Sequence, residues 1–157
     1  MVWFVRHAQV VLNLDRPAAT WRLSPAGVEA ADALARRLGP VPRVVSSPEP
    51  KAVATAEPLA RVSGVSLELD DRLREVERAA NLPNVEEHRA AVRAYLEGGE
   101  IAGWEASVDA RARFADALEA IDDAAVVTHA TVLSLFLGYG YERWSRIRLP
   151  DVIEWQP

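Results

Sequence analysis

The chain has 157 residues, a formal net charge of −5 and no cysteine. A length of roughly 100–200 residues is typical of one domain, so we expect a single domain over residues 1–157. The lack of cysteine excludes a disulfide framework, a thiolate metal site and a cysteine nucleophile. No apolar run approaches the roughly 20 residues that span a bilayer, and Arg6 comes too early for a signal peptide. We therefore expect a cytoplasmic protein without a membrane partner.

The charge is unevenly distributed along the chain. Residues 1–64 carry eight basic and five acidic side chains, whereas residues 65–157 carry ten basic and eighteen acidic ones. An acidic body with a mildly basic N-terminal part suits a small anionic ligand better than a nucleic acid. We therefore expect no nucleic-acid partner.

The N-terminal part predicts a buried strand followed by a complete helix. Val2–Val5 is a short, fully apolar run, which is typical of a strand that is buried on both faces. Ser24 and Pro25 provide an N-cap and a suitable first helical residue, and Gly39 ends the helix predicted over 26–38.

A second strand and helix follow. Arg43–Ser46 reads as a short strand, and Ser47 is expected to cap a helix that ends at Ser63–Gly64. Pro58 is expected to kink or shorten this helix, because it removes a backbone donor. Val65–Leu69 alternates as a third strand.

The remaining elements complete an alternation of strands and helices. The pattern predicts helices over 85–96, 105–121 and 131–137, a buried strand over 124–128, and an edge strand or hairpin within 147–155. Such alternation indicates an α/β fold, and we expect a three-layer αβα sandwich with a mostly parallel central sheet.

Two of the three histidines follow apolar strands. His7 follows the strand at Val2–Val5 and His129 follows the strand at 124–128, so both are expected at the sheet edge where ligands bind in open α/β folds. His88 lies in a charged helical run and is interpreted as a surface residue. Two histidines without a thiolate or an H-E-x-x-H pattern make a weak metal site, and Arg6 would oppose a cation. An oxyanion such as phosphate fits better, and we expect no metal.

Five short blocks now carry a resemblance to a known family. In chain order they are Arg6-His7-Ala8-Gln9 with Asn13 downstream, Leu23-Ser24-Pro25-Ala26-Gly27, Ser46-Ser47-Pro48 with Lys51, Leu73-Arg74-Glu75, and Val126-Val127-Thr128-His129-Ala130. The ordered set resembles the histidine phosphatase (phosphoglycerate mutase-like) superfamily over most of residues 1–139.

The resemblance implies a catalytic nucleophile and a phosphate site. By similarity, His7 takes the phosphoryl group and forms a phosphohistidine that water then hydrolyses, without a cofactor. This chemistry requires a neutral imidazole with one nitrogen free. The side chains implied to bind the phosphoryl group are Arg6, Asn13, Lys51 and His129.

The resemblance also implies a proton donor. Glu75 would protonate the leaving oxygen, which requires a pKa raised toward neutrality. Glu77, two residues further along, stays open as the alternative acid.

Three positions depart from the family pattern. Ala8 and Ala130 each replace a glycine, which would crowd the pocket if either glycine needed a positive φ. Lys51 replaces an arginine and exchanges a bidentate fork for a point charge. These departures are compatible with activity but keep a degenerate, non-catalytic phosphate-binding domain as an alternative.

The sequence therefore predicts a phosphatase that acts on a phosphomonoester. Because the chain is short for the family, residues 76–104 are the main segment available to cover the site, and we expect a shallow, open pocket. Such a pocket would admit a large phosphoester or a phosphorylated protein side chain, and a protein phosphohistidine phosphatase is the enzymatic alternative. The partner is a phosphorylated small molecule or a phosphoprotein, while the exact substrate and the oligomeric state stay open.

Overall fold

The computed structural model describes residues 1–156 and contains a five-stranded sheet in the order β3-β2-β4-β1-β5. The strands are β1 (Val2–Arg6), β2 (Val44–Ser46), β3 (Leu67–Leu69), β4 (Ala124–Thr128) and β5 (Asp151–Trp155). The first four are parallel to their neighbours, and only the edge strand β5 runs antiparallel to β1. The predicted α/β fold with a mostly parallel sheet is therefore confirmed.

The register of the two central strands decides where the site lies. Every residue of β4 is buried, as expected for a strand that is covered on both faces. Val5 pairs with Val127 and Arg6 pairs with Thr128, so β1 and β4 end at the same level. The residues that follow these two strands therefore emerge side by side at one edge of the sheet.

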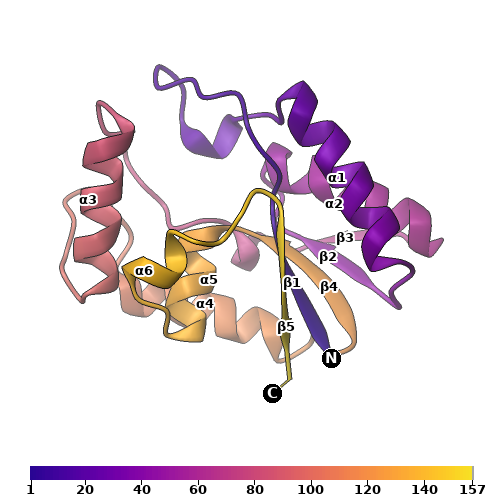
Figure 1. The fold of residues 1–157 in the computed structure, drawn as a ribbon. Helices are drawn as coiled ribbons and strands as arrows, with labels where there is room; N and C mark the ends of the chain where they lie inside the picture. Colours follow the sequence, from indigo (N-terminus) through magenta and orange to yellow (C-terminus); the bar gives the residue numbers. More distant parts are fainter. Residues whose placement is uncertain (157) are drawn as a thin grey trace.

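Two helices cover one face of the sheet (Figure 1). They are α1 (Pro25–Leu38) and α2 (Pro50–Ser63). The Ser24 side chain accepts a hydrogen bond from the Gly27 amide, so the predicted cap and bounds of the first helix are confirmed. Leu34 and Leu59 are both buried in an apolar cluster with Val5 and Val127, which fixes these helices on the sheet.

The opposite face is covered by α4 (Ser107–Leu118) and α5 (Ala130–Leu137) (Figure 1). Outside them, α3 (Val85–Leu96) and α6 (Tyr141–Trp144) pack against α5, and short 3₁₀ turns lie at Ala18–Thr20 and Asp71–Leu73. The ring of Phe4 lies 5.9 Å from that of Phe114 and 5.6 Å from that of Trp155, within an aromatic core on this face. Helices on both faces complete the predicted three layers. In residues 1–156 we find no helix that combines the length and apolar character required to cross a membrane.

For α2, the predicted cap and the predicted shortening at Pro58 are wrong. Ser47 does not cap this helix, which begins at Pro50 with Glu49 as its N-cap residue. Pro58 does not shorten the helix, which continues to Ser63. Pro58 and Leu59 are buried, and burial of this face against the sheet outweighs the loss of one backbone hydrogen bond.

Candidate active site

His7 and His129 lie together at the carboxyl edge of the sheet. Their ring centroids are 5.2 Å apart, and the His7 amide donates to the Thr128 carbonyl at 3.1 Å across the ends of β1 and β4. His7 is 8% exposed and His129 is fully buried. Both rings line a cavity of about 130 Å³, together with Arg6 and Lys51. The structure thus brings together the nucleophile and three of the four phosphate-binding residues that the sequence implied.

The hydrogen bonding of His7 defines its tautomer. Nδ1 lies 2.8 Å from the Ala8 carbonyl oxygen, which can only accept, so Nδ1 carries the hydrogen and Nε2 keeps its lone pair. Burial lowers the pKa of His7 well below its usual value, and the nearby His129 and Lys51 lower it further. His7 is therefore a neutral imidazole with one basic nitrogen, as nucleophilic attack requires.

His129 and Arg6 each hold a buried nitrogen without a partner. His129 Nε2 lies 2.9 Å from the Ser47 hydroxyl, whereas its Nδ1 has no hydrogen-bond partner within residues 1–156. Burial lowers the pKa of His129 to about 3, although Glu75 acts in the opposite direction. Arg6 donates through Nη1 to the Ile147 carbonyl, while its buried Nε has no partner in the same described part of the chain. Unsatisfied buried nitrogens are rare, and both belong to residues that line the cavity, which indicates an anion site.

Lys51 reaches the cavity but is already partly engaged. Its Nζ donates to the Ala18 carbonyl at 2.5 Å and to Glu49 Oε2 at 2.6 Å, which leaves one of its three protons for another acceptor. Glu49 is a buried member of the site that the sequence analysis missed. Its other carboxylate oxygen accepts from the Glu75 amide at 3.0 Å, so Glu49 ties the lysine to the segment that carries the candidate acid.

Glu75 lines the same cavity, but its protonation differs from our expectation. Its carboxylate accepts from the amides of Val76 at 2.9 Å, Thr131 at 3.0 Å and Val132 at 2.8 Å, and thereby stabilises the N-terminus of α5. Burial alone would raise the pKa of Glu75, but His129, Arg78 and the backbone amides outweigh it, and the pKa lies below its usual value. The expected raised pKa is therefore wrong for this structure.

Two other predicted features do not take part in the cavity. Asn13 is exposed, and its side-chain oxygen accepts from the Asp15 amide at 3.1 Å, so the structure does not bring it to the histidines. Glu77, the alternative acid, is exposed and does not line the cavity of His7. Both side chains belong to loops at the surface.

The two alanine substitutions cause no backbone strain. Ala8 and Ala130 are buried, and the non-glycine residue with a positive φ in the described chain is Asp123. Neither position therefore needs glycine for its conformation. Ala130 is among the residues that line the cavity.

Arg78 and His88 of the segment 76–104 line the cavity, and His7 is 8% exposed, so the site is more covered than the shallow, open pocket that we expected. His88, which we interpreted as a surface residue, lines the cavity of His7 together with Arg78 and Trp144. The periodicity of α3 could not show this, because it does not tell which neighbour a helix face meets. Arg78 Nη1 donates to His88 Nδ1 at 3.0 Å, and burial, followed by Arg78, lowers the pKa of His88 to about 4.

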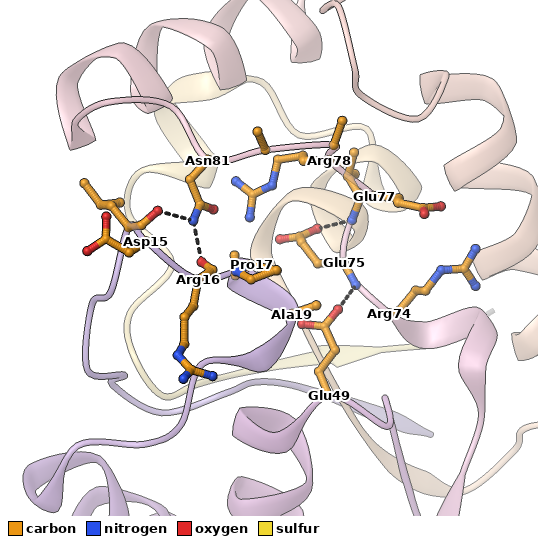
Figure 2. Close-up of a pocket in the computed structure, with 15 residues that line it drawn as sticks. Asp15, Arg16, Pro17, Ala19, Glu49, Arg74, Glu75, Glu77, Arg78 and Asn81 are labelled. Atoms are coloured by element: carbon orange, nitrogen blue, oxygen red, sulfur yellow. Dashed lines mark hydrogen bonds between the residues drawn. The ribbon is translucent and has the colours of Figure 1, made fainter.

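A second, larger cavity adjoins the first (Figure 2). It measures about 510 Å³ and lies between the loop 14–19 and the segment 74–81, with Glu49 among its lining residues. The side-chain amide of Asn81 donates to the carbonyls of Leu14 at 3.0 Å and Arg16 at 2.5 Å and joins these two walls. The two cavities share Ala18, Glu75 and Arg78.

The side chains of this site suit an anion, and His7 has the neutral imidazole that a nucleophile requires. Within residues 1–156, no three histidine or carboxylate side chains come together in a way that could hold a metal ion. Instead, the cavity gathers three neutral histidines, two arginines and a lysine beside the carboxylate of Glu75. Such a donor set can bind a phosphoryl group and stabilise the charge of its transfer.

Comparisons with known proteins give the fold and the family of this chain. A search of curated protein sequences gives no match. Among solved structures, a mycobacterial glucosyl-3-phosphoglycerate phosphatase has a TM-score of 0.71 and 24% identity, over 91% of this chain and 82% of its own. A phosphoglycerate mutase from Bacillus anthracis has a TM-score of 0.70 and 19% identity, over 87% and 77%. Bacillus stearothermophilus YhfR has a TM-score of 0.73 and 17% identity, over 99% and 91%.

At such low identities these structures establish the fold. The family itself follows from the sequence, since the model of the histidine phosphatase superfamily (branch 1) matches residues 2–152. The chain belongs to the histidine phosphatase superfamily.

Proposed function

We propose that this protein is a phosphatase that hydrolyses a phosphomonoester through a phosphohistidine on His7. The observation that carries the proposal is the neutral His7, whose Nδ1 is held by the Ala8 carbonyl and whose ring lies 5.2 Å from that of His129 in a buried cavity. Membership of a superfamily whose structural neighbours include a phosphatase and a mutase supports phosphoryl-transfer chemistry in general.

In the first step, the lone pair of His7 Nε2 attacks the phosphorus atom. The new P–N bond forms as the P–O bond to the alcohol breaks, and the leaving oxygen takes a proton from Glu75. Arg6 and Lys51 carry positive charge toward the nonbridging oxygens, where negative charge accumulates. If Ser47 donates its hydroxyl proton to His129 Nε2, the unpartnered Nδ1 of His129 carries hydrogen and donates to the same group.

In the second step, water attacks the phosphorus of the phosphohistidine. The Glu75 carboxylate takes a proton from this water, the P–N bond breaks, and inorganic phosphate leaves a neutral His7. We favour Glu75 over Glu77 as the donor, because it is the carboxylate that lines the cavity of His7 in the described chain. A phosphoryl dianion in this cavity places negative charge near Glu75 and favours its protonated form, which offsets the lowered pKa.

The enclosure of the site favours a small substrate. His7 is 8% exposed, and its cavity of about 130 Å³ opens beside one of about 510 Å³. A volume of roughly 300–1,000 Å³ is typical of pockets for small molecules. We therefore propose a phosphorylated small molecule rather than a folded phosphoprotein as the substrate.

The direct test is the release of phosphate from 4-nitrophenyl phosphate in the presence of EDTA. We expect turnover by the wild-type protein and its loss in His7→Ala, with circular dichroism as the control for folding. Rapid quenching with a ³²P-labelled phosphoester should trap an acid-labile, base-stable phosphoprotein only when His7 is present. Turnover that survives in His7→Ala would contradict the proposal. Binding of phosphate or vanadate without any turnover of several phosphoesters would instead support a non-catalytic phosphate-binding domain.

A further inference from the structure

Arg78 lies at the junction of the two cavities. It lines both the cavity of about 130 Å³ that contains His7 and the adjoining cavity of about 510 Å³. The smaller space suits a phosphoryl group and little more. The alcohol part of a phosphoester held at His7 can extend past Arg78 into the larger cavity.

The guanidinium group of Arg78 is held in place without a direct ion pair. Its Nη1 donates to His88 Nδ1 at 3.0 Å, and its central carbon lies 5.5 Å from the centroid of the Trp104 ring. His88 is neutral at pH 7, because burial and Arg78 lower its pKa to about 4. No carboxylate of residues 1–156 forms an ion pair with Arg78, and most of its five N–H donors have no acceptor there.

The buried carboxylates nearby are already engaged. Glu49 pairs with Lys51 at 2.6 Å, and Glu75 accepts from three backbone amides. Arg78 contributes to lowering the pKa of Glu75, so the two charges influence each other, but without direct contact. The positive charge of Arg78 is therefore available to another anion.

The other cations of the larger cavity differ from Arg78. Arg74 pairs with Asp71 at 2.7 Å. In Figure 2 the guanidinium of Arg78 lies between Asn81 and Glu75, whereas the guanidinium of Arg16 is directed away from both. Arg78 is thus the arginine that faces the path from the small cavity to the large one.

We propose that Arg78 is a specificity-determining residue that binds a carboxylate on the alcohol part of the substrate, which makes the preferred substrates phosphomonoesters with a second anionic group. This inference rests on the proposed function, since it assumes that the phosphoryl group occupies the cavity of His7. A guanidinium fork matches a carboxylate in a bidentate manner, and its fixation by His88 and Trp104 reduces the entropy lost on binding.

Calorimetric binding of phosphonates tests this assignment without requiring turnover. Phosphonoacetate and 3-phosphonopropionate carry a carboxylate at two distances from phosphorus, and ethylphosphonate and propylphosphonate are counterparts of equal carbon-chain length that lack the carboxylate. For the wild-type protein, we expect one of the carboxylated ligands to bind about 10-fold to 100-fold more tightly than its counterpart. Arg78→Gln should abolish this preference and Arg78→Lys should retain part of it. Arg74→Gln, which changes a paired arginine of the same cavity, should keep the preference in full.

The outcomes separate this inference from the proposed function. Equal binding of matched phosphonates by the wild-type protein overturns the inference. It is also overturned if Arg78→Gln weakens inorganic phosphate and all four phosphonates by the same factor, because Arg78 then serves the phosphoryl group itself. A clear carboxylate preference that depends on Arg78 supports the inference, and it does so even if no phosphoester is hydrolysed, a result that would count against the proposed function alone.

Discussion

Replacement of Glu75 should destabilise the fold as well as impair catalysis, because its carboxylate accepts from the amides of Val76, Thr131 and Val132. A hydrogen bond to a charged group contributes about 1.5–3 kcal/mol to stability. The three bonds share one carboxylate and are not additive. We therefore expect Glu75→Ala to lower the free energy of unfolding by about 3–5 kcal/mol, and Glu75→Gln, which keeps one oxygen, by about 1.5–3 kcal/mol.

Urea unfolding at pH 7, followed by circular dichroism, measures this loss. Glu77→Gln is the matched control, since Glu77 is exposed two residues away and should change stability by less than about 0.5 kcal/mol. The pKa of Glu75 is lowered in the folded protein, so its stabilisation is present above the unfolded pKa of about 4.3 and is lost as the pH falls toward the folded pKa. The deficit of Glu75→Gln should therefore shrink below about pH 4. Equal stability of the two glutamine variants at pH 7 would refute the reasoning.

The proton-donor role of Glu75 has a separate readout. At a temperature where the variant is folded, Glu75→Gln should lose far more kcat on an alkyl phosphate than on 2,4-dinitrophenyl phosphate, whose leaving group needs no proton. An equal loss on both substrates would leave Glu75 with only its structural contacts to α5.

Three further predictions follow from the packing and the charges. A Cβ on Gly27 would lie 2.1 Å from the backbone oxygen of Gln9, so Gly27→Ala should lower the free energy of unfolding in urea by at least about 1–3 kcal/mol. Gly140→Ala is the control and should be nearly neutral, because a Cβ there meets open space. Equal effects of the two substitutions would contradict this packing. Lys51→Met should lower the free energy of unfolding by about 3–5 kcal/mol, because it leaves the buried Glu49 unpaired. The double variant with Glu49→Gln should recover part of this lost stability. No recovery would show that the broken ion pair does not cause the loss. All three histidines have lowered pKa values, so none should titrate near pH 6.5 by NMR. The free energy of unfolding should decrease below about pH 6.5, because only the histidines of the unfolded chain then take up protons. A histidine resonance with a titration midpoint near 6.5 would contradict the burial of these side chains.

Local patterns in the sequence were sufficient for the sheet and for the two central histidines. The apolar runs before His7 and His129 predicted buried strands that end at one edge of the sheet, and the parallel pairing of β1 with β4 places the two side chains together there. The start of α1 could also be predicted from the sequence, because the Ser24 side chain and its partner, the Gly27 amide, are only three residues apart. Periodicity and capping are local properties, and a single sequence contains them directly.

Other features of the site were decided by contacts between residues far apart in the chain. The carboxylate of Glu75 stabilises the N-terminus of α5 because that helix begins next to it in space. Thr131, one of the residues whose amide it accepts from, lies 56 residues further along the chain. His88 lines the cavity instead of the surface because α3 packs beside the cavity. Because His88 is neutral, its hydrogen bond with Arg78 does not neutralise the positive charge of the arginine. The sequence by itself therefore determined the fold and the family and predicted His7 as the candidate nucleophile, whereas only the tertiary structure decided the protonation of the candidate acid and the cover of the pocket. The physical reason is that burial and hydrogen-bond partners arise from packing between distant segments, which local periodicity does not encode.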